Sequence, residues 1–300
     1  MAETLHAIIQ QARQRLDRAG IDPVEGALDA ELLARHALGG WDKGRLLASW
    51  REPAPVGFSR RFEPLVIRRE RREPTAYIIG HREFWGLEIA VAPGVLIPRP
   101  ETECIVEEAL TRVAKTPDQP PSNLQRGPAQ PVVRFADVGT GSGCLAIALA
   151  LAIPAARVAA IDMSSAALTI AAANVARHRV GDRVHLVRSS LLDAIAGPLD
   201  LIVSNPPYIP SGDLAALQPE IRNYEPALAL ASGTDGLDAI RRLVPMAAAR
   251  LAVHGWLMFE IGHGQAGHVQ AILDAEPRLA VVAWRDDLAG IPRVVVARRQ

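Results

Sequence analysis

The sequence predicts an α/β fold with a mostly parallel sheet, preceded by a small helical domain. After residue 132, short apolar runs with β-branched residues alternate with longer segments of helical periodicity. This alternation is typical of a sheet covered by helices on both faces. The last two predicted strands, 279–284 and 294–298, are separated by too few residues for a crossover helix. We therefore expect them to pair antiparallel at one edge of the sheet.

The first part of the chain is predicted to be helical. Apolar residues recur at helical spacing over residues 3–19, 27–38, 43–49 and 56–72. A β-hairpin is expected at 77–91, where the residues alternate and include Gly80 and Gly86. We therefore divide the chain into a helical N-terminal domain (1–73) for substrate docking, a hairpin connector (74–95) and a sheet domain (96–300).

The sheet domain is expected to open with a helix from about Thr102 to Ala114. Residues 115–131 hold five prolines without apolar periodicity, and we interpret them as a flexible linker. Further predicted strands are 133–138, 157–161, 184–187, 199–204 and 256–261, and the further helices are 144–152, 165–177, 237–251 and 265–275.

Composition excludes several classes of protein. Basic and acidic residues balance at 33 each, so no global charge indicates nucleic acid or a membrane as partner. No run of eighteen apolar residues predicts a membrane span. Cys104, Cys144 and the eight scattered histidines lack metal-ligand spacing, so no metal is expected. Reduced thiols and an N-terminus unlike a signal peptide predict a cytoplasmic protein, and we expect a monomer.

Residues 51–83 are rich in arginine. They contain eight arginines against five acids. We interpret them as a solvated helix face. The alternative is a weak docking surface for a partner that carries nucleic acid or acidic patches.

A stiff corner follows the predicted strand 199–204. Its residues are Asn205-Pro206-Pro207-Tyr208, and the prolines keep the chain extended. The Asn205 oxygen and a proline carbonyl are two acceptors for the hydrogens of a planar NH2 group. The alternative is an ordinary strand-to-loop turn.

A glycine-rich loop follows the strand 133–138 and opens a helix. Its spacing, from Gly139 to Gly143, is G-x-G-x-G, which differs from dinucleotide and P-loop patterns. Asp162 ends the next strand, where an acid can accept both hydroxyls of a ribose. Asp137, just before the glycines, can pair with a cationic amino group. These features together indicate S-adenosylmethionine as the cofactor.

The chain resembles the class I S-adenosylmethionine-dependent methyltransferases, and within them the HemK/PrmC family. This family methylates N5 of the glutamine in the Gly-Gly-Gln motif of class I peptide chain release factors. Besides the corner and the glycine loop, the resemblance is carried by 73–78, 97–103, 225–226, 235–237, 260–262 and 287–290. It implies a seven-stranded Rossmann-like sheet and a role in translation termination.

The resemblance also implies roles for individual residues. Asn205, Pro206 and Tyr208 are the expected catalytic residues, and with Pro207 they are expected to bind the substrate. The expected cofactor-binding residues are Asp137, Gly139, Thr140, Gly141, Ser142, Gly143, Asp162, Leu191 and Asn205.

Five positions have a weaker or open interpretation. The chain has Ser190 and Leu191 where the family commonly has an acid and an aromatic residue near the adenine. Recognition of adenine by a side chain is therefore left open. Arg99 and Glu101 are expected to form a helix-capping ion pair or, alternatively, a cofactor lid. Glu260 is interpreted as structural.

Other functions fit parts of the pattern. An N6-adenine, rRNA or DNA methyltransferase could use the same corner, because an aromatic residue can stack on a flipped base. The zero net charge and the lack of a large basic domain weigh against a direct nucleic-acid substrate. Methylation of another protein glutamine, as in a ribosomal protein, and a non-catalytic scaffold are the remaining alternatives.

Overall fold

The chain forms two compact units in the computed structural model, which describes residues 3–114, 132–287 and 289–300. Unit 1 comprises the residues up to His81 together with Gln218–Tyr224, and unit 2 comprises Arg82–Leu217 and Glu225–Gln300. The predicted linker 115–131 lies outside the described residues. Among the described helices, none has the length and apolar character needed to cross a bilayer.

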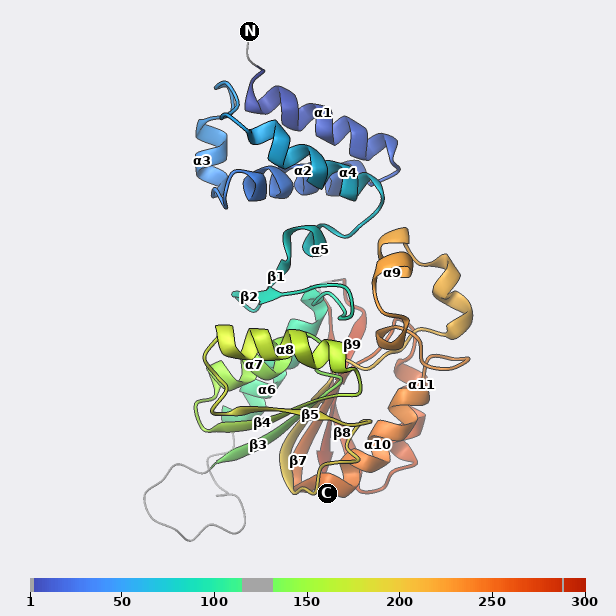
Figure 1. Ribbon diagram of the computed structural model, residues 1–300. Helices are drawn as coiled ribbons and strands as arrows, with labels where there is room; N and C mark the ends of the chain where they lie inside the picture. The colour runs from blue at the N-terminus through green and yellow to red at the C-terminus, as the bar shows by residue number, and fades with distance from the viewer. Residues whose placement is uncertain (1–2, 115–131, 288) are drawn as a thin grey trace. The chain divides into compact units, whose positions relative to one another are not determined.

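The N-terminal segment of unit 1 is a bundle of helices, drawn in blue in Figure 1. The four predicted helices are confirmed, with ends that differ by up to four residues. They are α1 (Leu5–Arg18), α2 (Pro23–Ala37), α3 (Lys43–Ala48) and α4 (Phe58–Glu70). The rings of Phe58 and Phe62 stack at 5.0 Å in the core, so the apolar stripe of α4 packs inward as its spacing predicts.

The predicted hairpin begins later than expected. Tyr77 lies in a short helix, α5 (Thr75–Ile79), and the hairpin consists of β1 (His81–Phe84) and β2 (Leu87–Ala90). Pro74 precedes α5, and Gly80 ends it at φ +86°. A proline before and a left-handed glycine after delimit a single helical turn. The alternation of side chains near Tyr77 was compatible with either structure, so its assignment to the hairpin was wrong.

Arg69 of α4 is buried, and the interpretation of this stretch as a solvated face was wrong for it. Its side chain is 1% exposed. It donates hydrogen bonds to Asp29 at 2.7 Å, to Glu220 at 2.7 Å and to Glu25 at 3.0 Å. Glu220 belongs to α9 (Pro219–Tyr224), the second segment of unit 1. The arginine therefore ties together residues that are far apart in the sequence.

We predict that Arg69→Ala destabilises the chain by about 3–5 kcal/mol, because Asp29 and Glu220 then stay buried without their main counter-charge. Urea unfolding of the whole chain, followed by tryptophan fluorescence, measures this loss. Arg60, exposed on the same helix, provides the control. Arg60→Ala should change the stability by less than about 0.5 kcal/mol. Equal unfolding midpoints for the two variants would contradict a stabilising role for the buried cluster.

Unit 2 contains the predicted seven-stranded sheet. The strands are β3 (Val133–Val138), β4 (Ala156–Asp162), β5 (Val184–Arg188), β6 (Leu199–Ser204), β7 (Leu251–Glu260), β8 (Leu279–Asp286) and β9 (Pro292–Arg299). Their order is β5-β4-β3-β6-β7-β9-β8. The first five in this order are parallel, and β9 is antiparallel to both β7 and β8. The expected antiparallel pair at one edge is thus confirmed.

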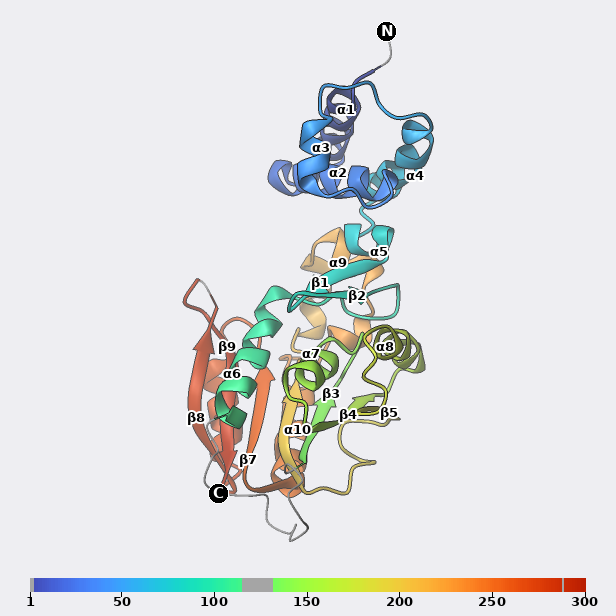
Figure 2. The same ribbon diagram turned by 90° about the vertical axis from the view of Figure 1, so that its left-hand side faces the viewer.

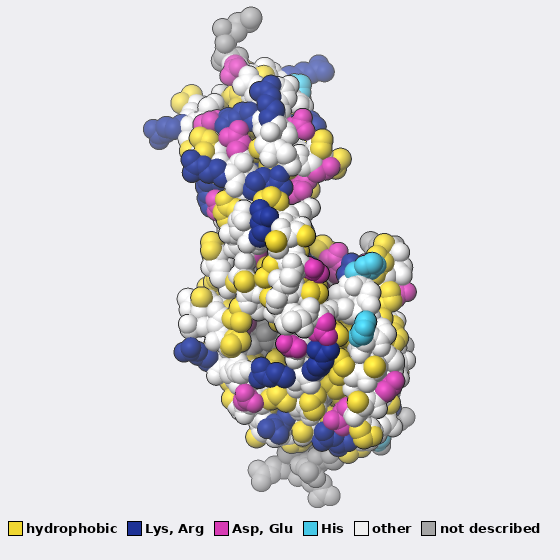
Figure 3. Space-filling view, turned by 90° about the vertical axis from the view of Figure 1, so that its right-hand side faces the viewer, with side chains coloured by type: hydrophobic (Ala, Val, Ile, Leu, Met, Phe, Trp, Pro, Cys, Tyr) yellow, Lys and Arg dark blue, Asp and Glu magenta, His cyan; other side chains and the backbone are white. Residues whose placement is uncertain are grey.

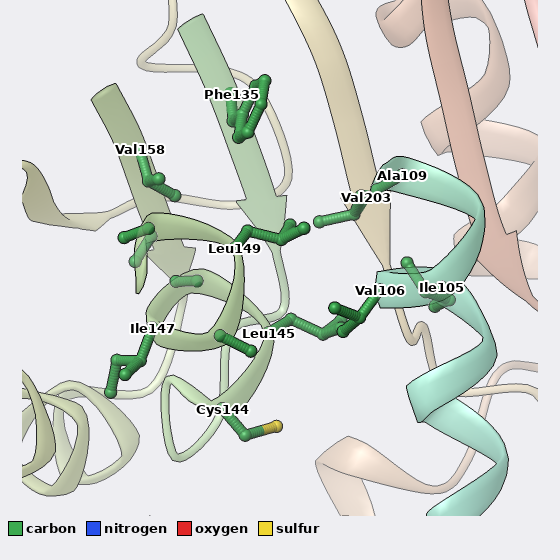
Figure 4. Packing of buried hydrophobic residues seen from close by; sticks show 14 of the residues in the cluster. Ile105, Val106, Ala109, Phe135, Cys144, Leu145, Ile147, Leu149, Val158 and Val203 are labelled. Atoms are coloured by element: carbon green, nitrogen blue, oxygen red, sulfur yellow. The ribbon is translucent and has the colours of Figure 1, made fainter. Parts of the chain in front are cut away.

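Helices cover both faces of this sheet (Figures 1 and 2). The helices of one face are α6 (Glu103–Ala114), α7 (Cys144–Ala152) and α8 (Ser165–Arg177), and those of the other are α10 (Asp238–Arg250) and α11 (Ala266–Asp274). Figure 4 shows Leu145 and Leu149 of α7 between the sheet and the side chains of α6. Helix α7 is almost entirely buried, which explains its continuous apolar sequence.

The side on which successive strands are added to the sheet changes between β3 and β6. From β3 the chain continues to β4 and β5 on one side, and from β6 it continues to β7 on the other. Ser204 pairs with Val138 in the register of the two strands. The glycine loop and the Asn205 corner therefore leave the sheet side by side, at the position where open α/β sheets bind ligands.

Candidate active site at the carboxyl end of the sheet

A cavity of about 410 Å³ lies at this end of the sheet in unit 2. Of the residues predicted from sequence, it is lined by Gly139, Thr140, Gly141, Ser142, Asp162, Leu191, Asn205 and Pro207. Four other predicted residues, Asp137, Gly143, Pro206 and Tyr208, are not part of its wall. The structure thus brings most of the predicted site together around one space.

The glycine loop turns closely around the end of β3. Gly139 and Gly141 have φ values of +74° and +56°, a region that glycine adopts without strain. A side chain on Gly139 would begin 3.9 Å from the carbonyl oxygen of Asn205. The carboxylate of Asp162 accepts hydrogen bonds from Gly141 N at 2.9 Å and Ser164 N at 2.8 Å. These bonds fix Asp162 at the cavity wall, while its oxygens keep lone pairs for a ligand.

Asn174 of α8 supports the same loop and was not identified from the sequence. Its side chain is buried. Its Nδ2 donates to the carbonyl of Ser142 at 2.8 Å and to that of Ala90 at 2.9 Å. Its Oδ1 accepts from Ala90 N at 2.8 Å. Because Ala90 belongs to the hairpin, only the folded structure reveals that this residue joins the hairpin to the glycine loop.

Asp137 lies behind the cavity wall and is fully buried. Its Oδ2 accepts from Thr140 Oγ1 at 2.6 Å and from Ala146 N at 3.1 Å. Its Oδ1 has no hydrogen-bond partner among the described residues. Burial raises the pKa of Asp137 to about 7, although its hydrogen bonds oppose the shift. The group thus changes charge near neutral pH, and a cation nearby would favour the carboxylate.

Asn205 is held by a chain of hydrogen bonds. Its Nδ2 donates to Thr102 Oγ1 at 2.9 Å. Thr102 Oγ1 in turn donates to Glu260 Oε2 at 2.6 Å. Thr102 belongs to the single turn η1 (Pro100–Thr102), and Glu260 ends β7. Among the described residues, none donates a hydrogen bond to Asn205 Oδ1. The carboxamide therefore keeps an acceptor at the cavity wall.

Tyr208 binds the second carboxylate oxygen of Glu260. Its hydroxyl donates to Glu260 Oε1 at 3.1 Å, and burial raises the pKa of this hydroxyl. Its main chain is closely surrounded. A side chain on Gly236 would begin 2.2 Å from the Tyr208 carbonyl oxygen, and Gln265 Nε2 donates to that oxygen at 2.9 Å. Tyr208 lines a second cavity of about 340 Å³, whose wall includes Gly262 and Gln265.

Arg99 does not pair with Glu101, and the expected helix-capping ion pair between them was wrong. Its partner is Glu225, whose Oε1 accepts from Arg99 Nη2 at 2.6 Å. The other oxygen of Glu225 accepts from Ile97 N at 3.0 Å. Glu225 thus anchors the loop that precedes η1, and Arg99 lines the first cavity. The partner was not predicted because it lies 126 residues further along the chain.

The wall near Ser190 contains an arginine that sequence reasoning missed. Arg242 of α10 lines the cavity and donates to Ser190 Oγ at 3.0 Å. Leu191 follows with a φ of +47°, which turns the chain sharply at this point. Ser190 and Leu191, which stand where the family commonly has an acid and an aromatic residue, thus lie beside the guanidinium of Arg242. In the part of the chain that the structure describes, no group of three or more His, Cys, Asp or Glu could hold a metal.

The burial of Asp137 predicts a pH effect on stability. Its carboxyl ionises above pH 3.8 in the unfolded chain but only near pH 7 in the folded chain. The stability that it contributes is complete at low pH and is lost as the pH rises to about 7. Asp137→Asn has no titrating group there. We therefore expect the wild-type chain to lose about 2–3 kcal/mol more than this variant between pH 5 and pH 8.

Thermal unfolding without added ligand at several pH values measures this difference. Asp193→Asn, an exposed carboxylate in the same unit, is the matched control and should follow the wild type. Parallel pH curves for wild type and Asp137→Asn would contradict the raised pKa.

Two family models match the chain. The PrmC N-terminal domain matches residues 7–80, and the methyltransferase small domain matches residues 123–219. Curated relatives match over nearly the whole chain. The release factor glutamine methyltransferase of Bradyrhizobium diazoefficiens is 41% identical over 97% of this chain and 95% of its own length. The enzyme of the same name from Geobacter sulfurreducens is 40% identical over 98% of this chain and 96% of its own length.

A solved structure supports the fold. The catalytic domain of human Mettl16, in complex with an RNA hairpin, is similar with a TM-score of 0.55. It covers 74% of this chain and 80% of its own at 16% identity. At this identity the similarity concerns the methyltransferase fold alone.

Proposed function

Because the chain belongs to the release factor glutamine methyltransferase family, we propose that it methylates N5 of the glutamine in the Gly-Gly-Gln motif of class I peptide chain release factors. It would act in translation termination, in the cytoplasm, and as a monomer. The observation that carries the proposal is the carboxamide of Asn205. Its Nδ2 is occupied by Thr102, and its Oδ1 is free to accept a hydrogen bond at the cavity wall.

We propose S-adenosylmethionine as the methyl donor, because the residues around the larger cavity fit its parts. Asp162 is fixed with free lone pairs and suits two ribose hydroxyls. The loop Gly139–Gly143 allows close approach of a ligand to the backbone. Asp137 lies behind the cavity wall with an unpartnered oxygen, and its negative charge favours an ammonium group nearby. Leu191 offers an apolar contact to the adenine, beside Ser190 and Arg242.

The chain's own residues position the acceptor nitrogen. When bound, the cofactor supplies a methyl group on a sulfonium, so that a carbon–sulfur bond is exchanged for a carbon–nitrogen bond and a thioether remains. Asn205 Oδ1 and the Pro206 carbonyl accept the two N–H groups of the glutamine amide and direct its nitrogen. Pro207 and Tyr208 pack on the flat carboxamide and exclude water. The surplus proton leaves the nitrogen for solvent.

Alignment is the main contribution in this mechanism. An amide nitrogen is a poor nucleophile, since its lone pair is delocalised into the carbonyl. Orientation of two reactants can lower a barrier by about 7–11 kcal/mol. Two fixed acceptors hold both hydrogens in one plane and so define where the lone pair can develop.

The charge distribution supports a protein substrate over a nucleic acid. Acidic and basic residues are equal in number, and on the face of unit 2 drawn in Figure 3 the two signs are interspersed. Binding to a phosphate backbone favours clustered Lys and Arg. The balanced charge therefore weighs against an N6-adenine or RNA amino group as the acceptor, and this alternative is tested directly below.

Methyl transfer from labelled S-adenosylmethionine tests the substrate. The acceptors are a folded class I release factor, the same factor with its Gly-Gly-Gln glutamine replaced, and a mixture of DNA and rRNA. Label on the first acceptor alone is the expected result. Label on nucleic acid alone would overturn the proposed substrate while retaining the corner as an NH2 site.

Two substitutions separate the acceptor site from the cofactor site. Asn205→Ala should lower kcat by about 10²–10³-fold, because an oriented acceptor is lost, with the cofactor Kd changed by less than about threefold. Asp162→Ala should raise the cofactor Kd by about 10–100-fold, because hydrogen bonds to a charged group are lost. Calorimetric titration and steady-state kinetics measure the two effects. The roles are wrong if the two variants exchange these phenotypes.

A further inference from the structure

We propose that Thr102 and Glu260 are positioning residues that set which way the Asn205 carboxamide faces, and thereby its competence for methyl transfer. This inference rests on the proposed function of the site. Glu260 was expected from sequence to be structural. The hydrogen bonds around it assign it a directional role.

The orientation of the Asn205 carboxamide follows from the number of protons available for the hydrogen bonds around Thr102. The hydroxyl of Thr102 has a single proton, and Thr102 donates it to Glu260 Oε2 in the 2.6 Å hydrogen bond. The Thr102 oxygen can then only accept from Asn205, which must present Nδ2, as it does at 2.9 Å. The second oxygen of Glu260 is also an acceptor, since the Tyr208 hydroxyl donates to it. An ionised glutamate that accepts two bonds therefore leaves Asn205 Oδ1 directed away from Thr102.

The sheet fixes this arrangement in space. In the register of β6 and β7, Ser204 pairs with Phe259, so Asn205, the first residue after β6, lies beside Glu260, the last residue of β7. Thr102 and Glu260 are each 2% exposed, so water cannot replace either partner. A reversed carboxamide would place Asn205 Oδ1 against an oxygen that has no proton left to donate. That loss opposes the reversal.

The same counting predicts how the network fails in acid. A protonated Glu260 can donate to Thr102, whose own proton is then free to point at Asn205. The carboxamide would turn and place its Oδ1, rather than Nδ2, against Thr102. The acceptor for the substrate N–H is then lost.

Burial and the charged groups around Glu260 determine the pH at which it becomes protonated. Burial raises the pKa of Glu260, the bonds from Thr102 and Tyr208 lower it, and the charge of Glu101 raises it while that of Arg293 lowers it. Cys104 of α6 also interacts with this carboxylate. The net direction is upward, so methyl transfer should decline as the pH falls through a value above the ordinary 4.5 of a glutamate.

The first test removes the hydroxyl while keeping the size of the side chain. Thr102→Val should lower kcat by about 10²-fold, because the reacting amide is no longer aligned, with KM for the release factor within about twofold. Thr102→Ser restores the hydroxyl and should return kcat to within about threefold of wild type. Since Thr102 also lines the cofactor cavity, the cofactor Kd is measured for both variants and should stay within about twofold.

The second test observes the carboxamide itself and does not need turnover. The chain has only four asparagines, Asn123, Asn174, Asn205 and Asn223, so labelling asparagine with 15N yields four side-chain NH2 pairs. Asn205→Ala assigns its pair by difference. That pair should move in Thr102→Val and return in Thr102→Ser, whereas the Asn174 pair serves as an internal control.

A pH titration measures the Asn205 NH2 pair and kcat under the same conditions. In wild type, the Asn205 NH2 pair and kcat at saturating cofactor should change with the same midpoint as the pH is lowered. In Glu260→Gln both transitions should be absent, because no proton can be gained there. Any titration of Asp137 remains in both proteins and is thereby distinguished from that of Glu260.

The outcomes separate this inference from the proposed function. If the wild type methylates the release factor but Thr102→Val retains its kcat, the positioning role is overturned. An Asn205 pair that still titrates in Glu260→Gln would overturn it as well. If the wild type methylates no release factor, the proposed substrate fails, while the NH2 resonances still decide whether Thr102 and Glu260 orient Asn205.

Discussion

The parallel pairing of β3, β6 and β7 is the constraint on which the site depends. These strands bring three loops to one edge, and their register sets the loops to within a residue of one another. Ser204 strengthens the arrangement by donating to the Val138 carbonyl at 2.7 Å, between the two parallel strands β6 and β3. A one-residue slip of β6 would move each of its side chains to the other face of the sheet. The Asn205 carboxamide would then be separated from Thr102. Site and sheet are therefore specified by the same hydrogen-bond ladder.

Local patterns in the sequence were sufficient for much of this architecture. The alternation after residue 132 predicted the order of strands and helices, because periodicity is a property of neighbouring residues. The short connection before β9 predicted its antiparallel pairing with β8. Tyr77 shows where local pattern is insufficient, since five residues between a proline and a glycine can form a helical turn or the start of a strand. Tertiary packing decided in favour of the helix, with Tyr77 buried.

What the sequence could not predict are pairings over long separations. Glu260 interacts with Thr102 across 158 residues and with Tyr208 across 52, and no spacing rule connects them. Arg69 was placed on a solvated face because its neighbours are polar, although its three acidic partners lie elsewhere in the chain. Asp137 was correctly placed beside the glycine loop, but its complete burial depends on how α7 covers the end of β3. Motifs thus indicated which chemistry is present, and the fold determined which groups have partners.

The two-part composition of unit 1 has a consequence for how the chain folds during synthesis. Residues up to His81 emerge first, but α9 follows only after about two thirds of the residues that form unit 2. Until then, Arg69 and Arg72 lack the carboxylate of Glu220, to which both bind in the folded state. The N-terminal helices can collapse early, yet their buried charge is balanced only late. Completion of unit 1 is thereby coupled to synthesis of the segment that follows the Asn205 corner, so that the two units mature together rather than strictly one after the other.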